Sequence, residues 1–102
     1  MRIYSPKALK QFAARHPSAA KSLEAWRRIT EHAAWANLHE VRRDYPHADA
    51  VAVQSGRTAT VFNIGGNKFR LVTAIHYNLG RVFVLRIFTH SEYDRLPWTE
   101  QL

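Results

Sequence analysis

The stretch TVFNIGGNKFRLVTAIHYNLGRVFVLRIFTHSEY, residues 60–93, decides the fold. Two runs rich in Val, Ile, Phe and Tyr follow turn signals at Gly65–Gly66 and at Asn78–Gly80, which is typical of antiparallel strands joined by tight turns. A third short run, ending at Ile64, precedes the first turn. The sequence therefore predicts three consecutive antiparallel strands.

The register of the last two strands follows from the alternation of their side chains. A three-residue loop at 78–80, with Gly80 in the left-handed conformation, keeps the apolar faces of both strands together. A two-residue loop would pair each apolar face with the wrong one. The predicted pairs are Tyr77 with Arg81, Ile75 with Phe83, Val72 with Arg86, Leu71 with Ile87, Arg70 with Phe88 and Lys68 with His90.

This register gathers four nitrogen-bearing side chains at one end of one sheet face: Lys68, Arg70, Arg86 and His90. The other end of that face is apolar and carries Val72, Ala74, Val82 and Val84. Converging cations beside an imidazole, which changes charge near neutral pH, fit an oxyanion or phosphate site. Ordinary solvated residues on the open face of an antiparallel sheet explain the same spacing equally well.

The N-terminal half predicts helices that pack against this sheet. Residues 1–4 are typical of a short strand, after which Ser5 suits an N-cap and Pro6 the first helical position. That helix ends at His16, and a second follows Pro17 with an apolar stripe at Leu23, Trp26, Ile29 or Thr30, and Ala33. A third helical piece is expected over 35–45, ended by Pro46.

Two further strands, a terminal turn and one domain complete the prediction. Strands are expected over 49–53 and 58–64, separated by the turn Ser55–Gly56. Residues 91–96 predict a helical turn, with Ser91 as its cap and Pro97 as its end. The predicted fold class is α+β: an N-terminal strand, two to three helices on one face of a mainly antiparallel sheet and a short C-terminal helical turn, in a single domain of residues 1–102.

Composition narrows the classes of function. The 15 Lys and Arg residues outnumber the 8 Asp and Glu residues, and the net charge of +7 favours nucleic acid or an acidic protein as the partner. The absence of cysteine excludes disulfides and thiolate nucleophiles. The six histidines lack metal-binding spacing, and Gly65–Gly66 is not followed by a helix as a phosphate-binding loop would be. No apolar run suits a signal peptide or membrane span, so we expect a cytoplasmic protein without membrane contact.

Three segments resemble the HigB toxins of the RelE-like superfamily: VFNIGGNKFRL at 61–71, IHYN at 75–78 and THSEYD at 89–94. The opening MRIYSPKALKQFAARHP fits the same family, so the resemblance covers nearly the whole chain. It implies a RelE-like fold and a type II toxin that cleaves translated mRNA in the ribosomal A site, without metal or cofactor, and so inhibits translation. It also implies a HigA-type helix-turn-helix antitoxin as partner, with operator DNA reached only through that antitoxin.

The resemblance and the basic cluster together suggest roles for individual residues. Lys68 and Arg70 stand where related toxins carry basic strand residues near the scissile phosphate, and His90 is the best candidate for general acid or base. Tyr93 stands where the family places an aromatic hydroxyl that could stack on a base or assist proton transfer, although an aromatic closing the core edge explains it as well. The residues expected to bind RNA or its phosphates are Asn63, Asn67, Arg86, Arg42, Arg43, Arg57 and Arg95.

Two other classes of function fit the same sequence. Superfamily members of the ParE type poison gyrase without cutting RNA, and the basic face could serve such a non-catalytic binding module. A chain that has lost activity could instead persist as an antitoxin-bound regulator of its own operon. Glu92 and Asp94 follow the last strand but have no acidic partner on the sheet, so the sequence predicts no carboxylate pair for acid–base chemistry.

Overall fold

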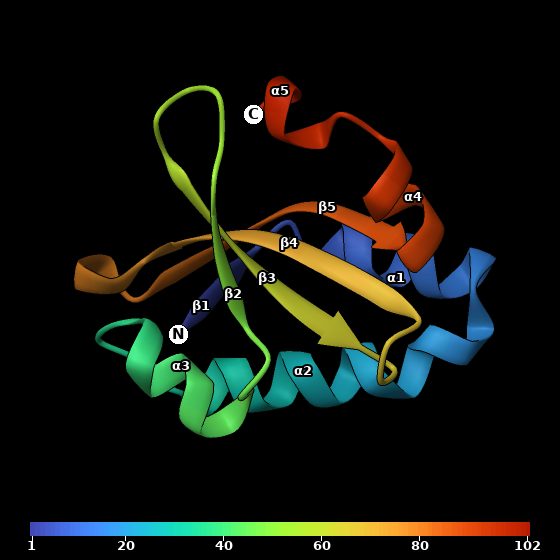
Figure 1. The fold of residues 1–102 in the computed structure, drawn as a ribbon. Coiled ribbons are helices and arrows are strands. Elements are labelled where there is room, and N and C mark those ends of the chain that lie inside the picture. The colour runs from blue at the N-terminus through green and yellow to red at the C-terminus, as the bar shows by residue number, and fades with distance from the viewer.

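A computed structural model describes all of residues 1–102 and contains a five-stranded sheet in the order β1-β5-β4-β3-β2 (Figure 1). β1 runs parallel to β5, and the other neighbouring strands are antiparallel. The strands are β1 (Arg2–Tyr4), β2 (Asp49–Ala52), β3 (Thr58–Ile64), β4 (Phe69–His76) and β5 (Arg81–Thr89). The predicted α+β class with a mainly antiparallel sheet is confirmed.

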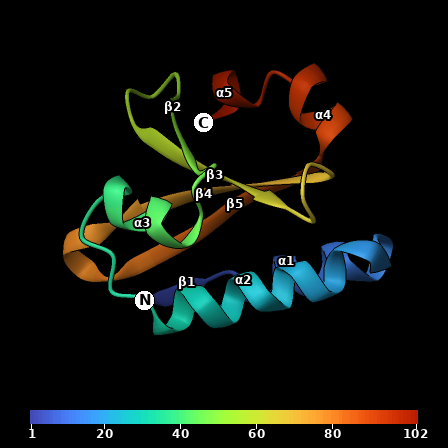
Figure 2. The same ribbon diagram turned by 60° about the horizontal axis from the view of Figure 1, so that its bottom comes forward.

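Three helices pack on one face of the sheet and build the larger core (Figure 2). They are α1 (Pro6–Arg15), α2 (Ala20–His32), which follows a short 3-10 turn, and α3 (Leu38–Asp44). Trp26 of α2 is fully buried and meets the ring of Phe62 on β3 edge to face, with 5.4 Å between ring centroids. Of the two candidates for the apolar stripe of α2, Thr30 is buried whereas Ile29 is exposed.

The ends of two predicted helices differ from expectation. Ser5 occupies the N-cap position of α1, but its backbone is left-handed (φ 68°) and its side chain makes no capping bond. The third helix begins at Leu38 rather than near Trp35, because Asn37 caps it by accepting a hydrogen bond from the Glu40 N–H. Trp35 lies before that helix in the core, where its Nε1–H donates to Asp44 at 2.8 Å.

The register between β4 and β5 is as predicted at one end and shifted at the other. Arg70 lies opposite Phe88, Leu71 opposite Ile87, and Val72 opposite Arg86. Thr73 then lies opposite Val84, so Leu85 is an extra residue in a β-bulge. Beyond the bulge Ile75 pairs with Val82 and His76 with Arg81, so the predicted pairs Ile75–Phe83 and Tyr77–Arg81 are wrong.

The bulge also moves two valines to the other face of the sheet. Val82 and Val84 belong to the core beneath the helices, not to the basic face on which strict alternation placed them. Val72 lies on the opposite side, in a second, smaller core. Gly80 does supply the expected left-handed position (φ 64°), at the end of a 3-10 turn over Tyr77–Leu79. The predicted three-residue loop over 78–80 is wrong, because His76 pairs with Arg81 and residues 77–80 form the loop.

The C-terminal segment covers this second face of the sheet (Figure 2). It forms α4 (His90–Arg95) and α5 (Trp98–Gln101), and α5 was not predicted, because Pro97 marks the end of the helical turn and only five residues follow it. Trp98 is only 4% exposed and packs with Val72, Phe88 and neighbouring apolar residues. No helix is both long and apolar enough to cross a membrane.

Truncating Trp98 should reveal how much α5 contributes to stability. We expect Trp98→Ala to lower the free energy of unfolding by about 3 kcal/mol, because it empties a buried aromatic site. Leu79→Ala is the control, since Leu79 is 56% exposed, and its effect should stay below about 0.5 kcal/mol. Urea denaturation of both variants measures the difference, and similar values for the two would show that α5 does not cover the sheet in solution.

Candidate functional site

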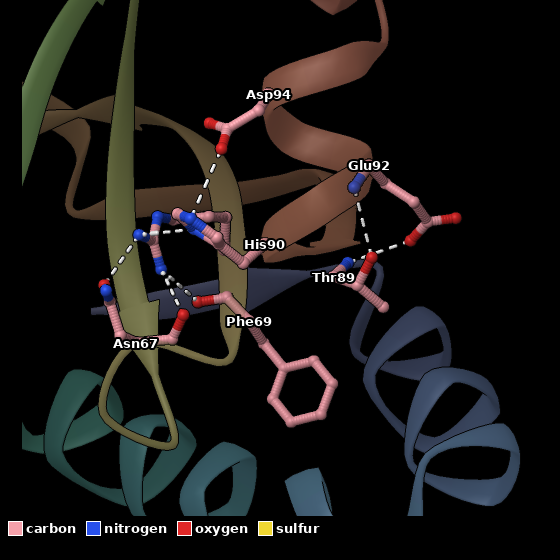
Figure 3. Close-up of polar contacts among 7 residues, drawn as sticks. Asn67, Phe69, Thr89, His90, Glu92 and Asp94 are labelled. Atoms are coloured by element: carbon pink, nitrogen blue, oxygen red, sulfur yellow. Dashed lines mark hydrogen bonds and ion pairs between the residues drawn. The ribbon is translucent and has the colours of Figure 1, made fainter.

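A buried arginine connects the turn after β3 to the start of α4. Arg70 is only 9% exposed, and its guanidinium donates to the Asn67 side-chain oxygen at 2.7 Å and lies 3.0 Å from Nδ1 of His90. It also donates to the backbone oxygens of Asn67 and Phe69, both at 3.2 Å. Nε2 of His90 lies 3.2 Å from the Asp94 carboxylate (Figure 3). The three side chains Arg70, His90 and Asp94 therefore form a continuous polar row. We call this row the histidine cluster.

Local turn and cap chemistry place the members of this cluster. Gly65 and Gly66 both have positive φ, 63° and 68°, which non-glycine residues rarely adopt, so the chain can reverse there and bring Lys68 beside β5. The backbone N–H of His90 donates to the Lys68 carbonyl at 2.8 Å, which keeps the predicted neighbours Lys68 and His90 together. Lys68 itself lies in the turn, one residue before β4 begins.

A capping box starts α4 at His90 rather than at Ser91. The Thr89 hydroxyl accepts from the Glu92 N–H, and the Glu92 carboxylate accepts from the Thr89 N–H (Figure 3). The prediction of Ser91 as the cap is therefore wrong. Because the helix begins at His90, Asp94 lies one helical turn further on and reaches the imidazole. The spacing of four between His90 and Asp94 is a sequence signal for this contact, but Asp94 was not predicted as a site residue.

The hydrogen bonds assign the tautomer of His90. A guanidinium can only donate, so Nδ1 facing Arg70 must be the acceptor of the neutral imidazole. The ring proton is then on Nε2, where it donates to Asp94. This pattern leaves a basic lone pair on Nδ1, next to a cation, with a carboxylate behind the ring. A hydroxyl that took the place of the guanidinium at Nδ1 would meet a base already oriented by Asp94.

Tyr93 borders the histidine cluster and the second core at once. Its ring lies 5.2 Å from the Trp98 ring between centroids, and the Arg70 guanidinium carbon lies 5.7 Å from its centroid. Burial, with the charge of Asp49 adding to it, raises the pKa of Tyr93 above its ordinary value, so the phenol keeps its proton at neutral pH. Tyr93 therefore has the contacts of a core-edge aromatic and the protonation state of a hydrogen-bond donor.

The other predicted site residues divide by their contacts. Asn63 lies opposite Arg70 on β3, and the Lys68 ammonium is exposed and forms no ion pair. Arg86 is exposed beside a hollow between β5 and α1, where it donates to the Leu85 carbonyl, and no contact joins it to the histidine cluster. Arg42 donates to the Ala48 carbonyl at 2.9 Å. The remaining predicted RNA-binding arginines are exposed and form no ion pair: Arg43, Arg57 and Arg95. No three His, Asp or Glu side chains lie close enough to hold a metal ion.

The capping box should make stability depend on pH. The Thr89 N–H lowers the pKa of Glu92 below its ordinary value of 4.5, so this stabilisation is present above that value and is lost as the pH falls through the lower, folded-state pKa. We expect Glu92→Ala to reduce the free energy of unfolding by about 1 kcal/mol at neutral pH. Denaturation of both proteins over a pH series should show their difference narrowing in acid. A difference that stays constant into acid would contradict the assigned cap.

Comparison with known proteins identifies the family of this chain. The family model described as "HigB_toxin, RelE-like toxic component of a toxin-antitoxin system" matches residues 19–96. The chain is similar to a protein named mRNA interferase HigB from Escherichia coli O6:H1 (strain CFT073), 28% identical over 96 residues, which cover 94% of this chain and 91% of that protein. The mRNA interferase toxin HigB of Escherichia coli K12 is 26% identical over 94 residues, covering 92% and 88%. Since the match extends over most of the sheet and helices, the chain belongs to the HigB_toxin family, the RelE-like toxic components of toxin–antitoxin systems.

Proposed function

We propose that the chain is an mRNA endonuclease that acts on translated message at the ribosome and so inhibits translation. The observation that carries the proposal is the histidine cluster, which we assign as the catalytic cluster and in which a buried arginine and a carboxylate hold the two ring nitrogens of one histidine. The names of the relatives, mRNA interferases, supply the class of substrate. We further propose that residues 1–102 act as one domain in the cytoplasm, with a HigA-type antitoxin as the neutralising partner.

The proposed reaction is attack by the 2′-hydroxyl on the neighbouring phosphate. Nδ1 of His90 takes the hydroxyl proton once Arg70 turns its guanidinium to the phosphate, and Asp94 stabilises the imidazolium that results. The P–O2′ bond forms and the P–O5′ bond breaks, which leaves a 2′,3′-cyclic phosphate and a 5′-hydroxyl end. Arg70 and Lys68 supply the positive donors for the charge that develops on the phosphate.

The leaving 5′-oxygen needs a proton, and Tyr93 is the proposed donor. Burial raises the pKa of Tyr93, which keeps its hydroxyl protonated, and the ring already contacts Arg70. Tyr93→Phe removes only the hydroxyl, whereas Tyr93→Leu also removes the stacking on Trp98. If the hydroxyl donates the proton, Tyr93→Phe should slow cleavage. If Tyr93 acts only as an aromatic at the edge of the core, only Tyr93→Leu should slow it.

The basic surface fits binding to the ribosome and its RNA. A protein of net charge +7 gains much of its affinity for RNA from contacts with phosphates. We propose that Arg43, Arg57 and Arg95, which form no ion pair, make such contacts together with Arg86. Arg42 donates to the Ala48 carbonyl and lies 3.8 Å from Asp49, so we assign it a smaller share.

Primer extension on a reporter message in a purified translation system tests the proposed function. The message is incubated with the wild-type protein or with Lys68→Ala, in the presence and in the absence of ribosomes. We expect cuts only on translated message and much weaker cuts with the variant. Folded protein that arrests growth but makes no cut would instead point to a target that is not RNA, such as gyrase.

A further inference from the structure

A hollow of about 390 Å³ opens beside the catalytic cluster, lined by His47, Asn63, Gly66 and Asn67. A smaller hollow of about 150 Å³ shares three of these residues and adds the apolar wall of Tyr45, Pro46 and Ala48. Because they share His47, Asn63 and Gly66, the two hollows adjoin, and we call them together the amide hollow. Its size falls at the lower end of the range for small-ligand sites in proteins.

Asn67 connects the amide hollow to the guanidinium of Arg70. Asn63 is the residue opposite Arg70 in the pairing of β3 with β4, so both side chains are on the same face of the sheet. Asn67 accepts a hydrogen bond from Arg70 at 2.7 Å, so it borders the catalytic cluster and the hollow at once. An RNA strand with its scissile phosphate at Arg70 therefore has an adjoining nucleotide within reach of the hollow.

The lining of the amide hollow suits a neutral ligand rather than a phosphate. It contains two amides and an imidazole but no lysine, arginine or carboxylate. The side chains of Asn63 and His47 make no hydrogen bond within the chain, and Asn67 is bonded only through its oxygen, which leaves its amide nitrogen as a donor. Unpaired amides of this kind recognise bases through paired donors and acceptors on the base edge.

The backbone at the turn helps to keep the hollow open. Gly66 has φ +68°, and a Cβ built there would have no heavy atom within 4 Å, so this wall faces free space rather than packed side chains. The neighbouring Gly65 is held closer to the core, where a Cβ would lie 3.4 Å from the Phe69 ring. The turn is therefore anchored on one side and open on the side of the hollow.

We propose that the amide hollow binds one unpaired RNA base beside the scissile phosphate, and that Asn63 and His47 read the edge of that base. This inference rests on the proposed function and deepens it, since it adds His47 to the site and assigns Asn63 to base recognition instead of phosphate binding. Lys68 and Arg70 then fix the position of the backbone, while the hollow selects where in the message the cut falls.

Binding of short RNAs tests the proposal without any need for cleavage. The probes are 2′-O-methyl hexanucleotides of A, C, G and U, which lack the attacking hydroxyl, and fluorescence anisotropy at fixed low salt measures their affinities. We expect the wild-type affinities to differ by at least fivefold between the best and the poorest probe, the lower end of what one good base contact provides. Asn63→Ala and His47→Ala should each narrow that spread to less than about twofold and leave the poorest probe unchanged.

Asn78→Ala is the matched control, because Asn78 is an exposed asparagine in the turn between β4 and β5 and does not line the hollow. The Asn78→Ala variant should show the same differences in affinity among the four probes as the wild-type protein. Equal affinity of the wild-type protein for all four probes, or an unchanged spread in Asn63→Ala and His47→Ala, overturns the proposal.

Sequencing the 5′ ends of cut message separates this result from the proposed function. If the variants cut as often as the wild type but at a wider set of sites, the hollow selects the base. If they cut at the same sites with the same frequencies, the hollow does not select it although the endonuclease assignment stands. If the wild-type protein discriminates among the probes but cuts no message, the proposed function is contradicted while the proposed base site still stands.

Discussion

Replacing His90 by alanine is expected to lower the rate of mRNA cleavage by about 10²- to 10⁴-fold, the usual contribution of a positioned general base. The physical reason is that His90 is the only imidazole in contact with both Arg70 and Asp94, so no neighbouring side chain can take over the proton transfer. Single-turnover cleavage of a translated message at saturating protein measures the effect on the chemical step rather than on binding.

Two further variants make the His90 prediction specific. His39→Ala is the control, since His39 is exposed on α3 and makes no side-chain hydrogen bond, and its rate should equal that of the wild type. Asp94→Asn keeps the shape of the side chain but removes the charge that stabilises the imidazolium, so its rate should fall between the wild type and His90→Ala. Wild-type activity in His90→Ala, with the fold intact by circular dichroism, would contradict the assigned base.

The second large effect is expected for Arg70→Lys, which keeps the positive charge but loses the planar fork. Lysine cannot donate to Asn67 and Phe69 together as the guanidinium does, and it offers the phosphate no planar fork, so we expect cleavage to fall by about 10²-fold or more. The same change should lower the free energy of unfolding by about 2 kcal/mol, because buried acceptors lose charged hydrogen bonds. Urea denaturation and single-turnover cleavage, performed on the same preparation, measure both effects.

Arg28→Lys is the control for that exchange, since the Arg28 side chain is 71% exposed and pairs only with Glu24 of the same helix. It should change neither stability nor cleavage by a measurable amount. If Arg70→Lys cleaved RNA at the wild-type rate, positive charge alone would suffice at this position, and the guanidinium geometry would have no role in the reaction.

The sequence predicted the sheet well because its turns and alternation are locally strong. Glycines at 65, 66 and 80 take the left-handed conformations that their hairpin turns need. The predicted pairing of Arg70 with Phe88 is present, although the loop before β5 is one residue longer than predicted, because the extra residue Leu85 restores the register. The register predicted from strict alternation is wrong between Leu85 and the loop that precedes β5. Both faces of β5 are covered by apolar cores, so the apolar residues of this strand give no sequence signal for a bulge.

The candidate site was predicted only where it depends on the pairing of neighbouring strands. The neighbours Lys68 and His90 follow from strand pairing, and the structure keeps them together through a backbone hydrogen bond. Asp94 was overlooked because its position depends on a helix that begins at His90, and the capping box of Thr89 and Glu92, not Ser91, sets that beginning. His47 comes from the segment between α3 and β2, whose approach to the β3–β4 turn is a tertiary contact that no local pattern encodes.

The proposed role of the catalytic cluster is to cleave RNA by activating a 2′-hydroxyl. The most direct test uses a synthetic message with a single 2′-deoxynucleotide on the 5′ side of the mapped cut, translated beside the all-ribose message. We expect the all-ribose message to be cut to leave a 2′,3′-cyclic phosphate, and the deoxy message not to be cut at that site. Equal cutting of both messages would contradict the 2′-hydroxyl mechanism, and no cutting of either by folded protein would contradict the assignment of this site to RNA cleavage.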